Sequence, residues 1–390
     1  MENRTLGRVL AGASLATIAA AGSLHAAALE QTVPTAVRLL YQEGMYAEFG
    51  LAYADPDQSG HDAILPPGVA GPGPVPITGN TGDLFRARWN FSGAFKGDIN
   101  DRLSYAVLFD QPYGADTFYR QGSFPDAFNY AGSLADVKTY QVSGVLAYDV
   151  NPNVKVYGGL RAERLDAKAA VPFVSGYSVD AGKNWGYGYL VGAAYARPEI
   201  ALRVALTYMS KIAHDLDTDE ELLIGGDAFF RDHTSTDVDT PQSVSLEFQT
   251  GINPKTLAIG SVRWVDWSEF DISPPLYEQA IAQLIGEPRP LVDYADDWWT
   301  YNLGIGRQLT ANLAGSVSIT YEPSIGGTMT TLGPYDGRTT GSIGLSYDYG
   351  QINVTGGLTY GVLGDATNLL DTDFDDGSVW GAGLRVGYTF

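Results

Sequence analysis

Apolar and polar residues alternate with a period of two along most of this chain. In the last segment, 378–390, Leu384, Val386, Tyr388 and Phe390 fall on one side of the pattern, and the residues between them are arginine, glycine and threonine. Such alternation is typical of a β-strand that has one face in an apolar environment and the other in a polar one. Because a membrane barrel is polar inside and meets lipid outside, the pattern favours a strand of such a barrel.

The same alternation recurs in fourteen segments. Most of them contain roughly 10 to 14 residues, which is enough for a tilted strand to cross the hydrocarbon layer. They are residues 45–54, 84–97, 102–111, 137–150, 153–165, 184–197, 199–212, 242–252, 255–266, 297–308, 312–322, 339–349, 351–362 and 378–390. Aromatic residues gather at the ends of several segments, where rings at the level of the lipid headgroups are expected. The pattern therefore predicts an all-β membrane protein.

The links between these segments alternate in length. Short links include an Asn-Pro turn at 151–152, whereas long links include 55–83, 166–183 and 213–241. Short turns on one side of the membrane and long loops on the other are typical of outer-membrane barrels, whereas a soluble β-sandwich does not require them. We therefore predict that residues 45–390 form a fourteen-stranded antiparallel transmembrane β-barrel with long extracellular loops and short periplasmic turns. An even number of strands places both termini in the periplasm.

The first residues of the chain predict export. Arg4 and Arg8 precede a small apolar run that begins at Val9, and small residues follow up to Ala28. This order of charged, apolar and small-residue regions is typical of a cleaved signal peptide, which we assign to residues 1–28. The apolar run is too short to cross a bilayer as a helix. We therefore expect a multi-pass protein in the outer membrane of a Gram-negative bacterium.

The composition agrees with an envelope barrel. The chain has 24 Tyr, 15 Phe, 7 Trp and 47 Gly, and it has no cysteine, so its fold does not depend on disulfides. Its formal net charge of −21 argues against nucleic acid as a partner. We instead expect contacts with outer-membrane lipid, and acidic loops that face a cation-rich lipopolysaccharide layer. The strand that ends at Phe390 is expected to be recognised by the barrel assembly machinery.

Several segments, taken in their order along the chain, resemble the FadL-type outer-membrane transporters of long-chain fatty acids and other hydrophobic compounds. They are Phe109–Gly114 (Phe-Asp-Gln-Pro-Tyr-Gly), Val262–Ser268 (Val-Arg-Trp-Val-Asp-Trp-Ser) and Trp299–Gly306. The resemblance implies a fourteen-stranded barrel and passive diffusion, in which the substrate is captured between extracellular loops, enters a lumenal pocket and leaves sideways through the wall.

In this family, a kink in the third strand accompanies the sideways exit, and the resemblance places that kink at Pro112 and Gly114. Proline cannot donate a ladder hydrogen bond, which agrees with a kink at this position. A strand that simply ends at a Pro-Tyr-Gly turn would have the same sequence. Both interpretations therefore remain open at this point.

The N-terminal segment departs from the family pattern. Family members usually carry a longer N-terminal plug with an Asn-Pro-Ala motif, whereas residues 29–44 are short and lack this motif. We therefore predict a plug that is reduced or absent. Residues 37–44 either extend the first strand or lie in the lumen, and the sequence does not distinguish these arrangements.

Two of the predicted long loops contain apolar segments. Loop 213–241 contains the run Leu222–Phe230, and loop 267–296 contains Pro275–Ile285, which we interpret as a short amphipathic helix. Exposed apolar surface often marks a binding site, although a loop that packs on a neighbouring loop would show the same pattern. The candidates for contact with an apolar ligand are Tyr113, Leu222, Leu223, Phe229, Phe230, Leu276, Ile281 and Ile285.

Two arginines are candidates for holding a substrate carboxylate. The alternation along their strands places Arg161 and Arg263 on the lumenal face. A guanidinium can bind a carboxylate through two parallel, charge-assisted hydrogen bonds. Barrel lumens also contain ladders of arginine and glutamate, so pairing with Glu163 or Glu247 is the structural alternative.

Other functions have less support in the sequence. After signal cleavage only His61, His214 and His233 remain, all in predicted loops, and no cysteine is present. We therefore predict no catalytic residue, no metal site and no cofactor. The predicted function is passive transport of long-chain fatty acids or other hydrophobic compounds. A water-filled general porin and an outer-membrane enzyme that acts on lipids are the alternatives.

Overall fold

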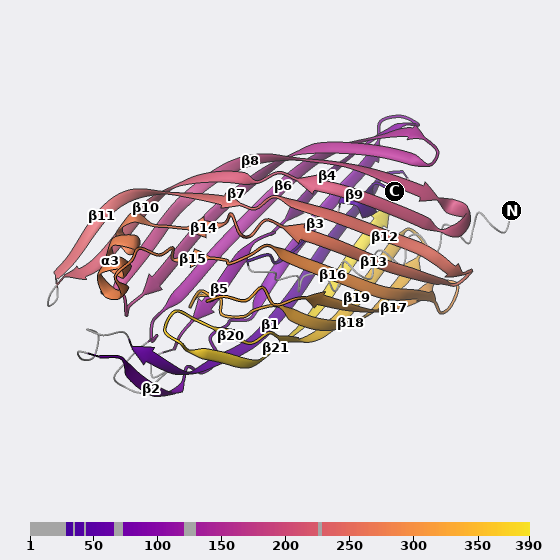
Figure 1. Cartoon of the computed structure of the whole chain (residues 1–390). Coiled ribbons are helices and arrows are strands. Elements are labelled where there is room, and N and C mark those ends of the chain that lie inside the picture. The colour runs from indigo at the N-terminus through magenta and orange to yellow at the C-terminus, as the bar shows by residue number, and fades with distance from the viewer. Residues whose placement is uncertain (1–28, 34–35, 43, 66–72, 121–129, 225–227) are drawn as a thin grey trace.

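The chain forms a closed antiparallel β-barrel, and the fold is nearly all β (Figure 1). The computed structural model describes residues 29–33, 36–42, 44–65, 73–120, 130–224 and 228–390. The predicted signal peptide, 1–28, lies outside the described residues. The wall closes where the first strand, β1, pairs with the last, β21.

Strands account for most of the described residues. In chain order the elements are α2 (Ala36–Leu39), β1 (Tyr46–Leu65), β2 (Val75–Asn80), β3 (Arg88–Asp98), β4 (Leu103–Asp110), β5 (Gly114–Phe118), β6 (Leu134–Asn151), β7 (Val154–Val171), β8 (Tyr177–Arg197), the 3-10 turn η2 (Pro198–Ile200), β9 (Leu202–Met209), β10 (Ile212–Ile224), β11 (Ala228–Thr240), β12 (Ser243–Asn253), β13 (Thr256–Val265), β14 (Asp271–Ile272), α3 (Pro275–Ile285), β15 (Val292–Asp293), β16 (Trp298–Gln308), β17 (Leu313–Glu322), β18 (Arg338–Tyr349), β19 (Ile352–Leu363), β20 (Ala366–Thr367) and β21 (Asp373–Thr389). Within the described residues, no helix has the length and apolar character needed to cross a membrane.

Three of the barrel strands are each built from two pieces. β4 and β5 both pair with β6, and β9 and β10 both pair with β8. β12 pairs with β9, and β11 pairs with β10, so β11 and β12 together form the next strand. The wall is therefore β1, β3, β4/β5, β6, β7, β8, β9/β10, β11/β12, β13, β16, β17, β18, β19 and β21. The predicted fourteen-stranded barrel is confirmed.

Side chains along each strand point alternately to the outside and to the lumen. On β16, Leu303 is 58% exposed whereas Trp298 is buried, and on β7, Leu160 is 75% exposed whereas Arg161 and Glu163 are buried. An outer surface with so many exposed apolar side chains is suited to lipid, because a soluble protein rarely exposes a continuous apolar belt. The alternation predicted from the sequence is confirmed.

The two ends of the barrel differ in shape (Figure 1). At the short-turn end, at the right of the figure, neighbouring strands are joined by tight connections, and the C-terminus lies there. At the long-loop end, at the left, β2, β10, β11 and α3 extend beyond the rest of the wall. The helix predicted within 267–296 is confirmed, because α3 spans Pro275–Ile285.

The predicted loops at this end are shorter than expected. β7 continues to Val171, and β10 and β11 pair without interruption from Ile212 opposite Thr240 to Ile224 opposite Ala228. The prediction that 213–241 is a loop is therefore wrong. Polar residues do not end an antiparallel ladder when each backbone N–H and C=O still meets a partner, so these strands continue beyond the alternating segments.

The helix α2 lies in the lumen near the short-turn end. Leu39 and Leu40 are buried against inward-facing residues of the wall. Arg38 forms an ion pair with Glu48 on β1, and Lys155 Nζ donates to the Leu40 carbonyl at 3.0 Å. Of the two arrangements that the sequence left open for this segment, the structure has the one inside the lumen.

Candidate functional site

The third strand of the wall is interrupted between β4 and β5. β4 ends at Asp110 and β5 begins at Gly114. Pro112 lies between them and has no backbone N–H to donate to a neighbouring strand. On one side, both pieces still pair with β6.

On the other side, the ladder to β3 has a gap. It ends at Phe109, and the next bridge joins Phe85 to Thr117 in the same register. Within the gap, the Phe91 N–H donates to the side-chain Oε1 of Gln111 at 2.7 Å. The strand is therefore interrupted and resumes, which excludes the alternative of a strand that ends at this position. We call this gap, which lies between β3 and the third strand of the wall, the β3 break.

Residues Leu29–Thr32, which we call the N-terminal strap, cover the β3 break from the lumen. The Gln31 N–H donates to the Pro112 carbonyl at 2.6 Å, and the Gly114 N–H donates to the Leu29 carbonyl at 2.9 Å. The strap thus binds backbone groups that the interrupted ladder leaves free. It is a separate piece of chain and not one of the fourteen strands.

The side chain of Gln31 fills the remaining space. Its Oε1 accepts a hydrogen bond from Asn90 Nδ2 on β3 at 2.8 Å. A Cβ atom added to Gly114 would lie 2.4 Å from Gln31 Nε2 and 2.8 Å from the Val137 carbonyl. Only glycine therefore allows the strap to approach the third strand this closely.

An apolar pocket lies on the lumenal side of the β3 break. It encloses about 730 Å³ of space between atoms, part of which is open to solvent. Leu29 of the strap and Tyr113 of the break both line the pocket. Further lining residues include Val137, Leu165, Val179, Leu216, Trp267 and Leu291.

The helix α3 covers this region at the long-loop end. Leu276 and Ile281 are buried, and Ile285 is partly buried, in the apolar cluster that also contains Tyr113 and Trp267. The sequence selected these α3 residues as ligand contacts. In the structure they pack on the cluster that surrounds the pocket.

The residues predicted in the β10–β11 hairpin lie in two environments. Leu222 is partly buried against the same apolar cluster. Leu223, Phe229 and Phe230 are exposed by 38%, 57% and 43%. The hairpin therefore presents apolar side chains at the surface of the long-loop end, next to the cluster that surrounds the pocket.

A buried carboxylate that the sequence analysis missed holds α3 in place. Glu220 on β10 accepts hydrogen bonds from the backbone N–H groups of Leu276 and Tyr277, both at distances within 3.3 Å, and from the hydroxyl of Tyr177 at 2.8 Å. Burial and then the neighbouring carboxylate raise the pKa of Tyr177 well above its usual range, so its hydroxyl remains a donor. The only signal in the sequence was that the residue at the N-cap of α3 is Pro274, whose side chain cannot accept a hydrogen bond from the helix.

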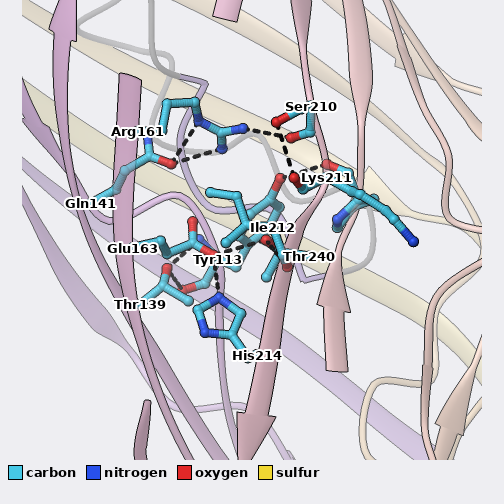
Figure 2. Close-up of polar contacts among 11 residues, drawn as sticks. Tyr113, Thr139, Gln141, Arg161, Glu163, Ser210, Lys211, Ile212, His214 and Thr240 are labelled. Atoms are coloured by element: carbon cyan, nitrogen blue, oxygen red, sulfur yellow. Dashed lines mark hydrogen bonds and ion pairs between the residues drawn. The ribbon is translucent and has the colours of Figure 1, made fainter. Parts of the chain in front are cut away.

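Arg161 points into the lumen, as predicted (Figure 2). Its Nε and Nη2 donate to Gln141 Oε1 at 3.0 and 2.7 Å, and its Nη1 donates to the Ser210 carbonyl at 2.9 Å. The predicted alternative of an ion pair with Glu163 does not occur. In the part of the chain that the structure describes, no carboxylate forms an ion pair with Arg161.

Glu163 instead interacts with His214 and Thr240 (Figure 2). The distance between His214 Nε2 and Glu163 Oε1 is 3.2 Å, and Thr240 Oγ1 donates to the same oxygen at 2.9 Å. The prediction that His214 lies in a loop is wrong, because this residue is buried on β10. Across residues 29–390, leaving aside the stretches without a description, no group of three His, Asp or Glu side chains is arranged to hold a metal ion.

Arg263 forms a bidentate ion pair with Glu30 of the strap. Its Nε and Nη2 donate to the two carboxylate oxygens at 3.1 and 2.6 Å, and its Nη1 donates to Ser245 Oγ at 2.7 Å. The structural alternative of an Arg–Glu pair is thus found for Arg263, but the partner is Glu30 and not the predicted Glu163 or Glu247. Period two predicts the face on which a side chain lies, but it does not predict a partner 233 residues away.

Comparison with known proteins assigns the chain to a family. Residues 4–375 match the model of the family described as outer membrane protein transport protein (OMPP1/FadL/TodX). The chain belongs to this family. The predicted resemblance is therefore confirmed, and the FadL/TodX family consists of outer-membrane transport proteins for hydrophobic compounds and not of enzymes. No curated protein sequence matches the chain.

Solved structures of the FadL/TodX family share the fold at low sequence identity. A FadL homologue of Pseudomonas aeruginosa superimposes with a TM-score of 0.73 at 17% identity, over 98% of each chain. The toluene transporter TodX of Pseudomonas putida gives 0.64 at 12% identity, over 90% of this chain and 91% of the other. The toluene transporter TbuX of Ralstonia pickettii gives 0.59 at 13% identity, over 90% of each chain. At these identities the likeness establishes the fold alone.

Proposed function

We propose that this protein is a passive diffusion channel of the outer membrane for long-chain fatty acids or other hydrophobic compounds. The observation that carries the proposal is that the apolar pocket reaches the β3 break, since Tyr113 of the break and Leu29 of the strap that covers it both line the pocket. Apolar molecules partition from water into such a pocket without an energy source. The break then gives them a sideways path to the membrane.

The route starts at the long-loop end, which we assign to the extracellular side because outer-membrane barrels have their long loops there. The exposed Leu223, Phe229 and Phe230 offer the first apolar surface. The molecule then enters the pocket and leaves through the β3 break, between β3 and the segment that contains Pro112 and Gly114, when the strap moves aside. Both termini lie in the periplasm in this orientation.

A fatty acid also needs a partner for its head group inside the barrel. Burying an ionised carboxylate without a partner is costly, so a lumenal cation is required. Arg161 fits this role because its present partners, Gln141 and the Ser210 carbonyl, are neutral. Arg263 is the second candidate. A neutral hydrocarbon needs neither, and the toluene transporters among the similar structures support this substrate class equally.

The two alternative functions have specific observations against them. A general porin needs an open aqueous lumen, whereas Leu39 and Leu40 of the N-terminal segment are buried inside this one. A hydrolase needs a nucleophile bonded to its base. Thr240 donates to Glu163 and not to His214, so this buried group is not a nucleophile paired with a histidine base.

Uptake into liposomes that contain the purified protein tests the proposal. We expect labelled oleate or toluene to enter faster than into empty liposomes, and a small labelled sugar to enter at the background rate. Sugar flux without uptake of either hydrophobic probe would establish the porin. Hydrolysis of a lipid ester by the purified protein would establish the enzyme.

Three further assignments follow from the sequence and are part of the proposal. Residues 1–28 are a signal peptide that is removed on export. The exposed terminal Phe390 is recognised by the barrel assembly machinery, and the acidic long-loop end contacts lipopolysaccharide. Sequencing the N-terminus of the mature protein tests the first of these, and an N-terminus before residue 20 would contradict it.

A further inference from the structure

The carboxylate of Glu30 contacts Arg263 as the carboxylate of a bound ligand would. The carboxylate meets the guanidinium in two parallel hydrogen bonds, and both side chains are buried, at 1% and 4% exposure. Among the described residues, no other carboxylate forms an ion pair with Arg263. This is the arrangement in which an arginine would hold the carboxylate of a small molecule.

Leu29, the residue before Glu30, corresponds to the apolar part of such a small molecule. Leu29 lines the apolar pocket while Glu30 occupies Arg263. An apolar group in the pocket and a carboxylate on the guanidinium are the two parts of a carboxylated amphiphile. The chain therefore supplies its own occupant for a site that has one apolar side and one cationic side.

The strap that carries this occupant is weakly attached compared with a strand of the wall. Among the described residues, its backbone hydrogen bonds go only to the β3 break, at Pro112 and Gly114, and Thr32 Oγ1 donates to the Gln111 carbonyl at 3.0 Å. Each such bond contributes about 0.5–1.5 kcal/mol net. A ligand that replaces the carboxylate on Arg263 could therefore displace the strap.

We propose that Glu30 is an internal competitor for substrate carboxylates, so that a carboxylated substrate must displace the strap from Arg263 whereas a neutral one binds with the strap in place. Arg263 cannot give two carboxylates the same bidentate contact, and leaving it without one would bury an unpaired charge. Glu30 is thus a residue that sets the preference between anionic and neutral substrates. This inference rests on the proposed transport function.

The first test replaces only the charge of Glu30. Oleate and toluene binding is measured on wild type, Glu30→Gln and Glu199→Gln, each in lipid nanodiscs, by equilibrium dialysis. Glu199 lies in an exposed turn at the short-turn end and gives the same change in net charge. We expect the Kd for oleate to fall about tenfold in Glu30→Gln alone, with the Kd for toluene unchanged within about twofold. An unchanged or weaker oleate affinity in Glu30→Gln would overturn the inference.

The second test fixes the strap in place. The chain has no cysteine, and Thr32 lies opposite Gln111 in the register set by the bridge between Glu30 and Tyr113. The double variant Thr32→Cys/Gln111→Cys therefore allows a disulfide between strap and break. The oxidised protein should bind toluene but lose oleate, and reduction should restore oleate binding.

Equal oleate binding by the oxidised and reduced forms would overturn the inference. Wild-type protein that binds neither oleate nor toluene would instead remove the proposed function, and the inference with it. Binding of both probes by wild type, with no response to Glu30→Gln or to the disulfide, removes the inference alone.

Discussion

Three described strands of this barrel are built from two pieces, and the interruptions in two of them, β4/β5 and β9/β10, are sealed differently. The β3 break is covered by the strap, which comes from outside the wall. The second interruption lies between β9 and β10, where Ile212 is fully buried over β8. A Cβ atom added to Gly186 or Gly188 would lie 2.4 or 2.7 Å from the side chain of Ile212. There the wall seals itself, with one strand's side chain against another strand's glycines.

This difference determines which interruption is able to open. Withdrawing Ile212 would expose a buried side chain, at a cost of about 1.5–3 kcal/mol, and would move a strand that pairs with both neighbours. Withdrawing the strap breaks a few hydrogen bonds and the buried Glu30–Arg263 ion pair, which has its own cost, but all fourteen strands stay paired as before. A passage through the wall is therefore expected at the β3 break and not at β9–β10.

The largest effect is expected at the self-sealed interruption. In Gly186→Val the new side chain would meet Ile212 and, at 2.6 Å from its Cβ, the Ala213 carbonyl. Overpacking of this kind costs about 1–3 kcal/mol. We expect a lower temperature for loss of the folded band in heat-modifiable gel migration. The matched variant Gly341→Val, where no atom lies within 4 Å of an added Cβ, should migrate like wild type. Equal tolerance of both variants would contradict a tight seal.

The next effect should separate the strap from the wall. Gln31→Pro removes the N–H that donates to the Pro112 carbonyl, so the strap should detach more often. We expect faster toluene uptake into liposomes. The free energy of unfolding, followed by heat-modifiable gel migration, should change by no more than about 1 kcal/mol. Gln31→Ala keeps the backbone donor and should have a smaller effect. A loss of stability as large as that of Gly186→Val would show that the strap is part of the wall.

A smaller, local effect is expected away from both interruptions. Glu220→Gln removes the charge that caps α3, which should weaken the helix by about 0.5–2 kcal/mol. Hydrogen exchange at the Leu276 and Tyr277 amides should become faster. In the control Glu221→Gln, which affects an ion pair with the exposed Arg231, these amides should not change. Faster exchange along β9 or β10 near Ile212 would mean that the seal depends on α3.

The smallest effect concerns the middle of the β10–β11 hairpin, which follows the second interruption. A hydrogen bond to Asp219, at 2.9 Å, raises the pKa of the exposed His233 above its usual value of 6.5. Because the folded pKa is raised, this contact stabilises the hairpin below the usual pKa and is lost as pH rises through the folded pKa. An NMR titration should show a higher pKa in wild type than in Asp219→Asn. Equal pKa values in the two proteins would show that His233 and Asp219 do not interact, and neither seal would be affected.

The sequence predicts most of the wall but not what seals it. Alternation with period two identifies the fourteen strands, because lipid on one side and a polar lumen on the other constrain every second residue. It also identifies α3 through its apolar spacing. The same reasoning misplaces His214, because an antiparallel ladder continues wherever two strands still pair, whatever the polarity of their side chains.

Contacts between distant segments have no periodic signal. Glu30 binds Arg263, and Glu220 caps α3, only because the closed barrel brings them together. The sequence placed Arg263 correctly in the lumen but assigned its carboxylate partner to the wrong residues. The kink at Pro112 and Gly114 was implied by the family resemblance alone, because a proline that removes a ladder donor fits a strand that ends there equally well.

The central claim is that hydrophobic molecules leave through the β3 break once the strap moves. Toluene transport into liposomes by Thr32→Cys/Gln111→Cys, oxidised and then reduced, tests it most directly. The control is Ser342→Cys/Thr359→Cys, whose hydroxyl groups lie 2.8 Å apart across the uninterrupted β18–β19 ladder. We predict that oxidation of the strap variant lowers transport to the rate of empty liposomes, that reduction restores it, and that the control is unaffected. If the oxidised strap variant, with its strap locked, transported toluene as fast as the reduced protein, the claim would be contradicted.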